Sequence, residues 1–340
     1  MSLGLEGWQA AERIAVTAAA YARHENGLGE WMQLRNRLRA FGRFLYAEDL
    51  IARRAGCSLD DALEGALQLD PYDRVWVTEG LGYAHGSRIS GADPPLLKRR
   101  MLPARSLIPL HAGMGLALAG TLLNDFTAGS IAERLGRFVD LCTRHAMPGY
   151  ASVTFEALGL ATRGLTPHLM TELAVEIERL HPSLVAYFWH GVGRGSYFSP
   201  LLAATLTPTR DLVTSALAAA PIGEAAANVV AGLAWAVVLI NIRDPDVIDQ
   251  FVSSCGGDAG TVAAMGDGID RAIHVWATCV GPDARLRALA AWRPAAADRW
   301  ERLVARPARR HLSGCRPSER PARWFRYRLA GAGAAASMGV

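Results

Sequence analysis

Small residues recur along this 340-residue chain at two alternating spacings, and this periodicity restricts the fold more than any other feature of the sequence. Seven short segments carry a glycine or alanine at a comparable place, in motifs such as Glu79-Gly80-Leu81-Gly82 and His190-Gly191-Val192-Gly193. The marker positions are 40, 80, 113, 157, 191, 232 and 268, so neighbouring markers lie 33 to 44 residues apart and alternate markers 73 to 78 apart. A fixed period of this size is typical of repeat proteins.

Two half-units of unequal length therefore make one repeat. Ser58 and Thr207, each followed by acidic residues, are typical helix N-termini. We expect each half-unit to be a helical hairpin and the chain to be all-α, with repeated hairpins in a curved or closed α/α array of the solenoid or toroid kind. The expected organisation is an N-terminal helical lead-in over 1–30, one repeat domain over 30–280, and a basic C-terminal cap with a flexible tail over 281–340.

The glycines indicate close helix packing. Glycine inside a helix lowers its stability by roughly 1 kcal/mol relative to alanine, so its repeated use at equivalent places indicates that a second backbone approaches there. We expect helix-interior positions for Gly113, Gly159 and Gly232, which lie in long apolar runs. For Gly80 and Gly191 a position at a helix C-terminus is an alternative.

Composition and charge narrow the class of protein. Hydrophobic residues make up 51% and charged residues 20%, which excludes a disordered chain. The net charge of +4 is uneven, because residues 281–340 carry +9 and the remainder −5. No nucleic-acid-binding signature accompanies the basic region, so we expect a solvated cap and no specific nucleic-acid partner.

The cysteines and the N-terminus favour a cytoplasmic protein. Five scattered cysteines without a CxxC pair exclude a disulfide framework and a zinc ribbon. No basic segment followed by an apolar run marks a secretory leader. The apolar stretches 107–123 and 229–240 are shorter than the roughly 20 residues that cross a bilayer, so we expect buried core helices and no transmembrane segment.

The residue before each marker is the candidate for chemistry. These residues are Arg39, Glu79, Ala112, Glu156, His190, Ala231 and Asp267. Equivalent positions in a curved array would converge on an inner face. There Glu79, Glu156, His190 and Arg194 could perform general acid–base catalysis. Alternatively, Glu79, Glu156, His190 and Asp267 could hold a divalent metal. The sequence identifies no cofactor.

A structural role is the alternative for the same residues. Arg43, Arg194 and Arg271 follow the marker-minus-one residue by four positions, and they could pair with the two glutamates to join repeats. His111 and His85 are secondary candidates. A lone histidine on an apolar helix is usually a core residue with satisfied hydrogen bonds.

A DDxxE pattern at Asp60-Asp61-Ala62-Leu63-Glu64 matches a magnesium–diphosphate motif of class I terpene synthases. Asn124-Asp125, with Ser130 and Glu133 after it, resembles their second motif at the wrong spacing. Because a serine precedes the first pair, helix capping explains these acids better.

The order of the motifs resembles a known family. It runs from the EGLG segment through His111-Ala112-Gly113-Met114-Gly115 and Pro148-Gly149-Tyr150 to Gly191-Val192-Gly193-Arg194 and an AGLAWA segment. Over about residues 40 to 255 this order is similar to the uncharacterised UnbL-like proteins of enediyne biosynthetic gene clusters. The resemblance implies a bacterial protein that acts in the maturation of a polyketide-type natural product. It implies no catalytic residues.

We therefore expect a biosynthesis protein that binds an apolar or polyene-like small molecule in an internal cavity. Glu79, Glu156 and His190 would supply acid–base or metal-assisted chemistry, and Arg194 would orient an anionic group or a carboxylate. One alternative is a non-catalytic α-solenoid scaffold that docks another protein of the biosynthetic cluster. A second is a polyene or isoprenoid cyclase. Whether the protein is an enzyme stays open.

Overall fold

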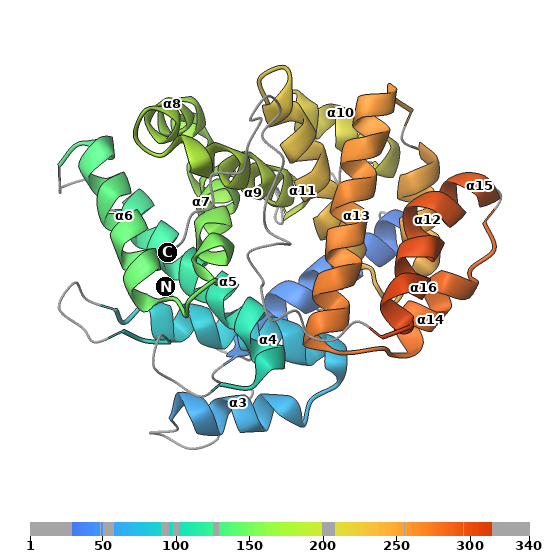
Figure 1. Ribbon diagram of the computed structural model, residues 1–340, viewed down its shortest axis with the longest axis horizontal. Coiled ribbons are helices and arrows are strands. Elements are labelled where there is room, and N and C mark those ends of the chain that lie inside the picture. Colours follow the sequence, from blue (N-terminus) through green and yellow to red (C-terminus); the bar gives the residue numbers. More distant parts are fainter. Residues whose placement is uncertain are drawn as a thin grey trace.

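The computed structural model describes residues 29–47, 49, 58–89, 95–97, 102–124, 129–198, 208–254, 256–294 and 296–314. These residues form helices and no strand, which confirms the all-α prediction (Figure 1). The first described helix covers residues 29–45. The helices after it are α3 (Leu59–Leu67), α4 (Pro71–Gly86), α5 (Leu107–Asn124), α6 (Ile131–His145), α7 (Ala151–Leu165), α8 (Met170–Leu180), α9 (Val185–Phe198), α10 (Leu212–Leu217), α11 (Glu224–Ile240), α12 (Pro245–Ser254), α13 (Ala259–Cys279), α14 (Ala284–Ala291), α15 (Ala297–Trp300) and α16 (Arg306–Leu312).

Seven helices pack one on the next in chain order: the helix of residues 29–45, α4, α5, α7, α9, α11 and α13. We call these the inner helices. Each inner helix from α5 to α11 is followed by a flanking helix, α6, α8, α10 or α12 (Figure 1). This alternation agrees with half-units of two helices. The inner helices are apolar on most sides, as in α11, where every residue from Asn228 to Ile240 is buried.

Glycines set the distance between inner helices. All the marker glycines lie inside helices, Gly80 and Gly191 included, so the helix-interior interpretation is confirmed. A Cβ on Gly113, Gly191 or Gly232 would lie within 3.0 Å of a carbonyl oxygen of the preceding inner helix, closer than real Cβ atoms come to such a neighbour. Only glycine permits this backbone approach.

The second glycine of each motif faces the following helix. The pairs of glycine and facing carbonyl are Gly82 with Leu110, Gly115 with Thr154, Gly159 with Phe188, and Gly193 with Val229. A Gly-x-Gly motif therefore places one glycine against the previous helix and the other against the next. The complete motif has this role in α4, α5 and α9, while in α7 an alanine, Ala157, takes the place of the first glycine.

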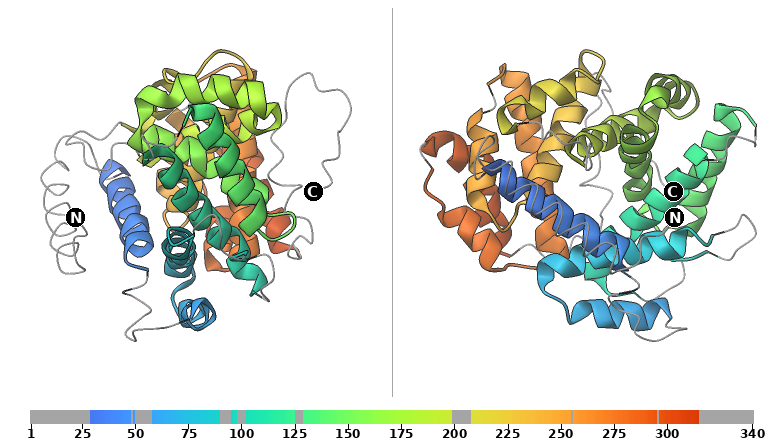
Figure 2. Two further views of the ribbon diagram at one scale, coloured as in Figure 1. Left: turned by 90° about the vertical axis from the view of Figure 1, so that its left-hand side faces the viewer. Right: turned by 180° about the vertical axis from the view of Figure 1, so that it is seen from behind.

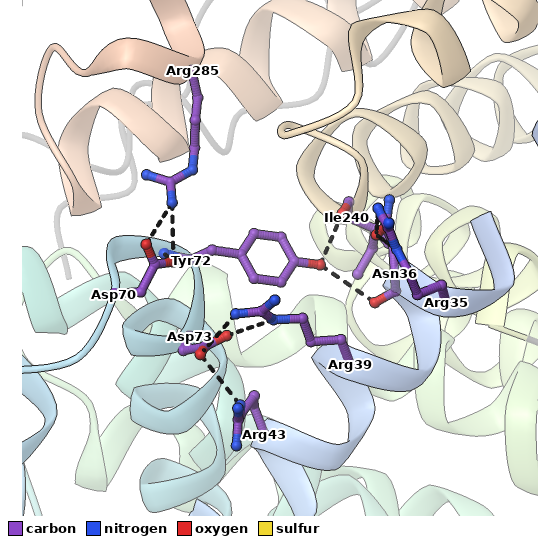
Figure 3. A network of polar contacts seen from close by, with 9 residues as sticks. All are labelled: Arg35, Asn36, Arg39, Arg43, Asp70, Tyr72, Asp73, Ile240 and Arg285. Carbon is purple, nitrogen blue, oxygen red and sulfur yellow. Dashed lines mark hydrogen bonds and ion pairs between the residues drawn. The ribbon is translucent and has the colours of Figure 1, made fainter. Parts of the chain in front are cut away.

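The first inner helix lies beside segments that are distant in the sequence (Figure 2), and a polar network joins it to them. At its centre the Tyr72 hydroxyl, at the start of α4, donates a 2.8 Å hydrogen bond to the carbonyl of Ile240 (Figure 3). The amide of Asn36 donates to Asn241 Oδ1 at 3.0 Å, and Asn241 in turn donates to the Tyr197 hydroxyl at 2.7 Å. The helix of residues 29–45 thus contacts α4 and the C-terminal ends of α9 and α11.

Two arginine–aspartate contacts fix the start of α4. Arg39 donates to both carboxylate oxygens of Asp73, at 2.9 and 3.0 Å (Figure 3). Arg285 of α14 donates to Asp70, the N-cap residue of α4, at 2.7 Å. The N-terminal helix and the C-terminal region are therefore held to the same end of α4.

The C-terminal region is helical as far as it is described. α14, α15, the π-helical segment Glu301–Ala305 and α16 pack on one another and on α13. The expected tail beyond residue 314 lies outside the described residues, as does most of the lead-in over 1–30.

The acidic DDxxE segment caps a helix. The Ser58 hydroxyl accepts a hydrogen bond from the backbone N–H of Asp61, and the Asp61 carboxylate accepts one from the backbone N–H of Ser58. Ser130 and Glu133 form the same capping box at the start of α6. The capping interpretation of the DDxxE segment is confirmed. Thr207 and Asp125 lie outside the described residues.

Both apolar stretches form inner helices. Among the described residues, the helical segment Ala104–Asn124 is long and apolar enough to cross a membrane by length and composition, and 83% of its apolar window is buried inside the protein. The other apolar helix, Glu224–Ile240, is shorter. Their hydrophobic surface is thus used in helix–helix packing.

Paired substitutions on α5 test the role of the glycines. We expect Gly113→Ala to lower the free energy of unfolding by about 3 kcal/mol or more, because the added methyl group forces α4 and α5 apart. Gly120→Ala is the matched control on the same helix. Its added methyl group meets nothing within 4 Å, so we expect stability to rise by up to about 1 kcal/mol. Urea denaturation measures both; equal effects would contradict the packing explanation.

Candidate functional site

Four side chains predicted from the sequence meet between three inner helices, and we call them the charge cluster: Glu79 of α4, Glu156 of α7, and His190 and Arg194 of α9. Arg194 Nη1 donates to Glu156 Oε1 at 3.1 Å, and His190 Nδ1 lies 2.7 Å from the same oxygen. Arg194 Nη2 lies 3.9 Å from Glu79 Oε1. All four residues are buried, and Glu79 is the most exposed at 6%.

The glycine packing positions these side chains. The backbone carbonyls of Glu79, Glu156 and His190 each rest on a glycine of the next inner helix, at Gly113, Gly191 and Gly232. Such contacts fix the height and rotation of each helix relative to its neighbour. Glu79, Glu156 and His190 consequently come together although 111 positions of sequence separate the first from the last.

Glu156 is an ionised carboxylate with two strong partners. Burial alone would raise its pKa, but His190 and Arg194 hold the pKa of Glu156 at about 2. Burial lowers the pKa of His190, against the attraction of Glu156. His190 is therefore neutral and donates its Nδ1–H to the carboxylate, while Arg194 provides the positive charge. This arrangement satisfies the expectation that buried charges are paired.

Glu79 is in a different electrostatic environment. Burial raises its pKa to about 7; nearby Glu156 adds to this, and Arg194 opposes it. At 3.9 Å from Arg194 its carboxyl makes an ion pair and, within the described part of the chain, no hydrogen bond. The 8% exposure of its side chain leaves contact with solvent. Glu79 can thus gain or lose a proton near neutral pH.

The sequence analysis missed Trp235 of α11. The guanidinium carbon of Arg194 lies 4.0 Å from the centre of the Trp235 indole, a cation–π contact. A signal was present, because Trp235 follows Ala231 by four positions just as Arg194 follows His190. The residue four positions beyond the marker-minus-one residue therefore lies at the charge cluster on both α9 and α11.

Asp267 does not join the charge cluster, and its prediction as a metal ligand with Glu79, Glu156 and His190 is corrected here. Its carboxylate is half-exposed and pairs with Arg271 Nε at 2.8 Å, one turn further along α13. Across the residues that the structure describes, no three His, Cys, Asp or Glu side chains are grouped as a metal site requires. The physical reason is that the Asp267 carboxylate is half-exposed and already neutralised by Arg271 of its own helix.

The other arginines considered as partners of the glutamates have different partners. Arg39 and Arg43 both contact Asp73, at 2.9 and 3.4 Å. Arg271 contacts Asp267. Among the three arginines that lie four positions beyond a marker-minus-one residue, Arg194 pairs with both Glu79 and Glu156.

The two secondary histidines lie outside the cluster. His111 Nδ1–H donates to the Leu107 carbonyl at 2.6 Å, and its Nε2 accepts from the Met147 N–H at 3.0 Å. Burial lowers the pKa of His111 to about 4, so the ring stays neutral. His111 is thus a core histidine, as the structural alternative expected. His85 lies half-buried in the last turn of α4.

Comparisons with known proteins return no match: no family model, no curated protein and no solved structure is similar to this chain. The resemblance to enediyne biosynthesis proteins therefore stays a prediction from sequence motifs.

Replacing each glutamate with glutamine should change stability in opposite directions. The folded state raises the pKa of Glu79 from 4.5 to about 7, so Glu79 reduces stability as pH rises through this interval. The pKa of Glu156 falls from 4.5 to about 2, so Glu156 contributes stability that is present above pH 4.5 and lost below it. Above pH 7 we expect Glu79→Gln to stabilise and Glu156→Gln to destabilise the protein, each by about 3 kcal/mol.

Urea denaturation as a function of pH measures both effects. Glu79→Gln should also remove the loss of stability between pH 4.5 and 7. If both variants were destabilised equally above pH 7, the two carboxyl groups would not differ in ionisation as described.

Proposed function

We propose that the protein is an acid–base catalyst that transfers a proton on a small apolar molecule at the charge cluster. The observation that carries this proposal is that two carboxyl groups beside the same arginine differ widely in pKa. The pKa of Glu156 is about 2 and that of Glu79 is about 7. Pairs of titratable groups whose environments drive their pKa values apart are typical of acid–base sites. A general base or acid works best when its pKa lies near the working pH.

The cluster residues have distinct roles in this proposal. Glu79 accepts or donates the proton. Arg194 supplies a fixed positive charge beside it. Glu156 and His190 hold Arg194 in place through the two bonds to Glu156 Oε1 and do not exchange protons at neutral pH. They are positioning residues.

We propose further that the inner helices form a curved or closed array around an internal cavity that a small molecule enters. The link from Tyr72 of α4 to Ile240 of α11 supports such closure, because it joins helices 168 positions apart. The exposed fractions of the Glu79 and Arg194 side chains, 8% and 5%, support a narrow approach to the cluster.

The substrate class follows from the sequence resemblance. We propose an apolar or polyene-like intermediate of a polyketide-type natural product, converted in the cytoplasm of a bacterium. The apolar inner helices suit such a molecule. No observation favours the isoprenoid cyclase, since Asp61 of the DDxxE segment is engaged in a capping box.

Infrared difference spectroscopy tests the proton-transfer role directly. We expect a C=O stretch of a protonated carboxylic acid that disappears as pH rises through about 7, and we expect this transition to be absent in Glu79→Gln. Glu176→Gln, on the exposed face of α8, is the control and should leave the band unchanged. A wild-type protein without this band would contradict the proposal.

The second test is an activity assay, which requires the substrate. Native mass spectrometry of protein purified from its host would identify it. We expect Glu79→Gln to keep the fold and to lower the rate about 10²- to 10⁴-fold, the usual contribution of a general acid or base. An empty protein in stable complex with another biosynthetic protein, together with full tolerance of Glu79→Gln, would favour the scaffold alternative.

A further inference from the structure

The guanidinium of Arg194 is only partly used by the protein. Nη1 donates to Glu156, and the flat face rests on Trp235. Nη2 meets Glu79 at 3.9 Å, beyond hydrogen-bond distance. Nε is buried and has no hydrogen-bond partner among the described residues. The edge formed by Nε and Nη2 is therefore the part of Arg194 that can still donate hydrogen bonds.

Arg194 Nη2 and the Glu79 carboxyl are close enough to act on one bound molecule. Nη2 lies 3.9 Å from Glu79 Oε1, so the two atoms do not form a hydrogen bond with each other. A substrate oxygen at an ordinary hydrogen-bond length of about 2.9 Å from Nη2 would be held beside the carboxyl. An oxygen at this position would have the positive guanidinium on one side and a carboxyl that exchanges protons on the other.

We propose that the substrate of the charge cluster is a carbonyl compound whose oxygen binds to the Nε–Nη2 edge of Arg194 while Glu79 removes a proton from the adjacent carbon. This inference rests on the proposed acid–base function and specifies its substrate class and reaction. A buried guanidinium stabilises the negative oxygen that forms in such a reaction more than it stabilises the neutral carbonyl.

The reaction balances without a further reactant. The Glu79 carboxylate takes a proton from the carbon next to the carbonyl, and the electron pair of the broken C–H bond forms a C=C bond. The carbonyl π pair moves onto oxygen, and the resulting enolate is held by Arg194. The protonated Glu79 then returns the proton to the same carbon or to a conjugated one. The net result is isomerisation or exchange of a C–H hydrogen.

Trp235 and Glu156 keep the guanidinium in the orientation that this binding needs. The indole lies against its face, and Glu156 holds Nη1, so the opposite edge points away from both. A guanidinium fixed in this way loses little entropy when it binds an oxygen.

Binding of 2-naphthol tests the proposal. This flat aromatic alcohol, when ionised, resembles the enolate of a cyclic ketone, and its absorption and fluorescence distinguish the ionised from the neutral form. We expect the wild-type protein to bind it in the ionised form. Glu79→Gln should bind it at least about tenfold more tightly, because the amide removes a competing carboxylate and donates a hydrogen bond to the oxygen. Arg194→Gln should lose the ionised bound form.

A control variant distinguishes the specific role of Arg194 in binding from the general effect of removing an arginine. Arg163→Gln changes an arginine of α7 that donates to Ser196, outside the cluster, and should leave binding unchanged. If Arg194→Gln fails to fold, the comparison of Glu79→Gln with wild type decides. Bound naphthol that stays neutral, or binding that Glu79→Gln does not strengthen, would overturn the carbonyl proposal.

The naphthol and infrared experiments together distinguish failure of the carbonyl proposal from failure of the proposed function. A Glu79 carboxyl that titrates near neutral pH in the infrared experiment, with naphthol bound only in its neutral form or not bound, would retain proton transfer and reject the carbonyl substrate. A carboxyl that does not titrate there would reject both.

Discussion

The close approach of inner helices at glycine is the interaction on which the rest of the structure depends. Each contact places the Cα of a glycine against a carbonyl oxygen of the neighbouring helix, as for Gly113 and Glu79. Each glycine lowers the stability of its helix by roughly 1 kcal/mol relative to alanine. The close contact that it permits adds dispersion attraction between the two backbones. Because one Gly-x-Gly motif serves two neighbours, a single helix transmits its height and rotation to both. The small residues recur at alternating spacings in the sequence because the inner helices pack at these positions.

This packing also explains how charged side chains can meet in an apolar interior. A buried ion pair is favourable only with good geometry, because desolvation opposes it. Flexible helices could not hold Glu156, His190 and Arg194 at their observed distances of 2.7 and 3.1 Å. Here the carbonyl groups of Glu156 and His190 are themselves seated on glycines of the next helix. The residues that fix the backbone and those that carry the charge are therefore the same.

The period of the sequence was sufficient to predict the helices and the four residues of the charge cluster, because equivalent positions in equivalent helices face the same way. It could not predict which equivalent positions are buried. Asp267 occupies a marker-minus-one position, yet α13 is the last inner helix and leaves this carboxylate half-exposed beside Arg271. Arg39, on the first inner helix, likewise turns to Asp73. Periodicity gives the direction of a side chain along the array, whereas burial depends on having a neighbour on both sides.

The difference between Glu79 and Glu156 follows from the same geometry. Both residues precede a marker, and both carboxyl groups lie near Arg194. However, α9 packs directly against α7, whereas it does not pack closely on α4. Glu156 consequently receives the guanidinium at 3.1 Å and the histidine of the adjacent helix, while Glu79 is left at 3.9 Å. One arginine cannot neutralise two buried carboxylates, so the more distant one must hold its proton more tightly. A repeat of identical backbone contacts thus produces one structural carboxylate and one that exchanges protons near neutral pH.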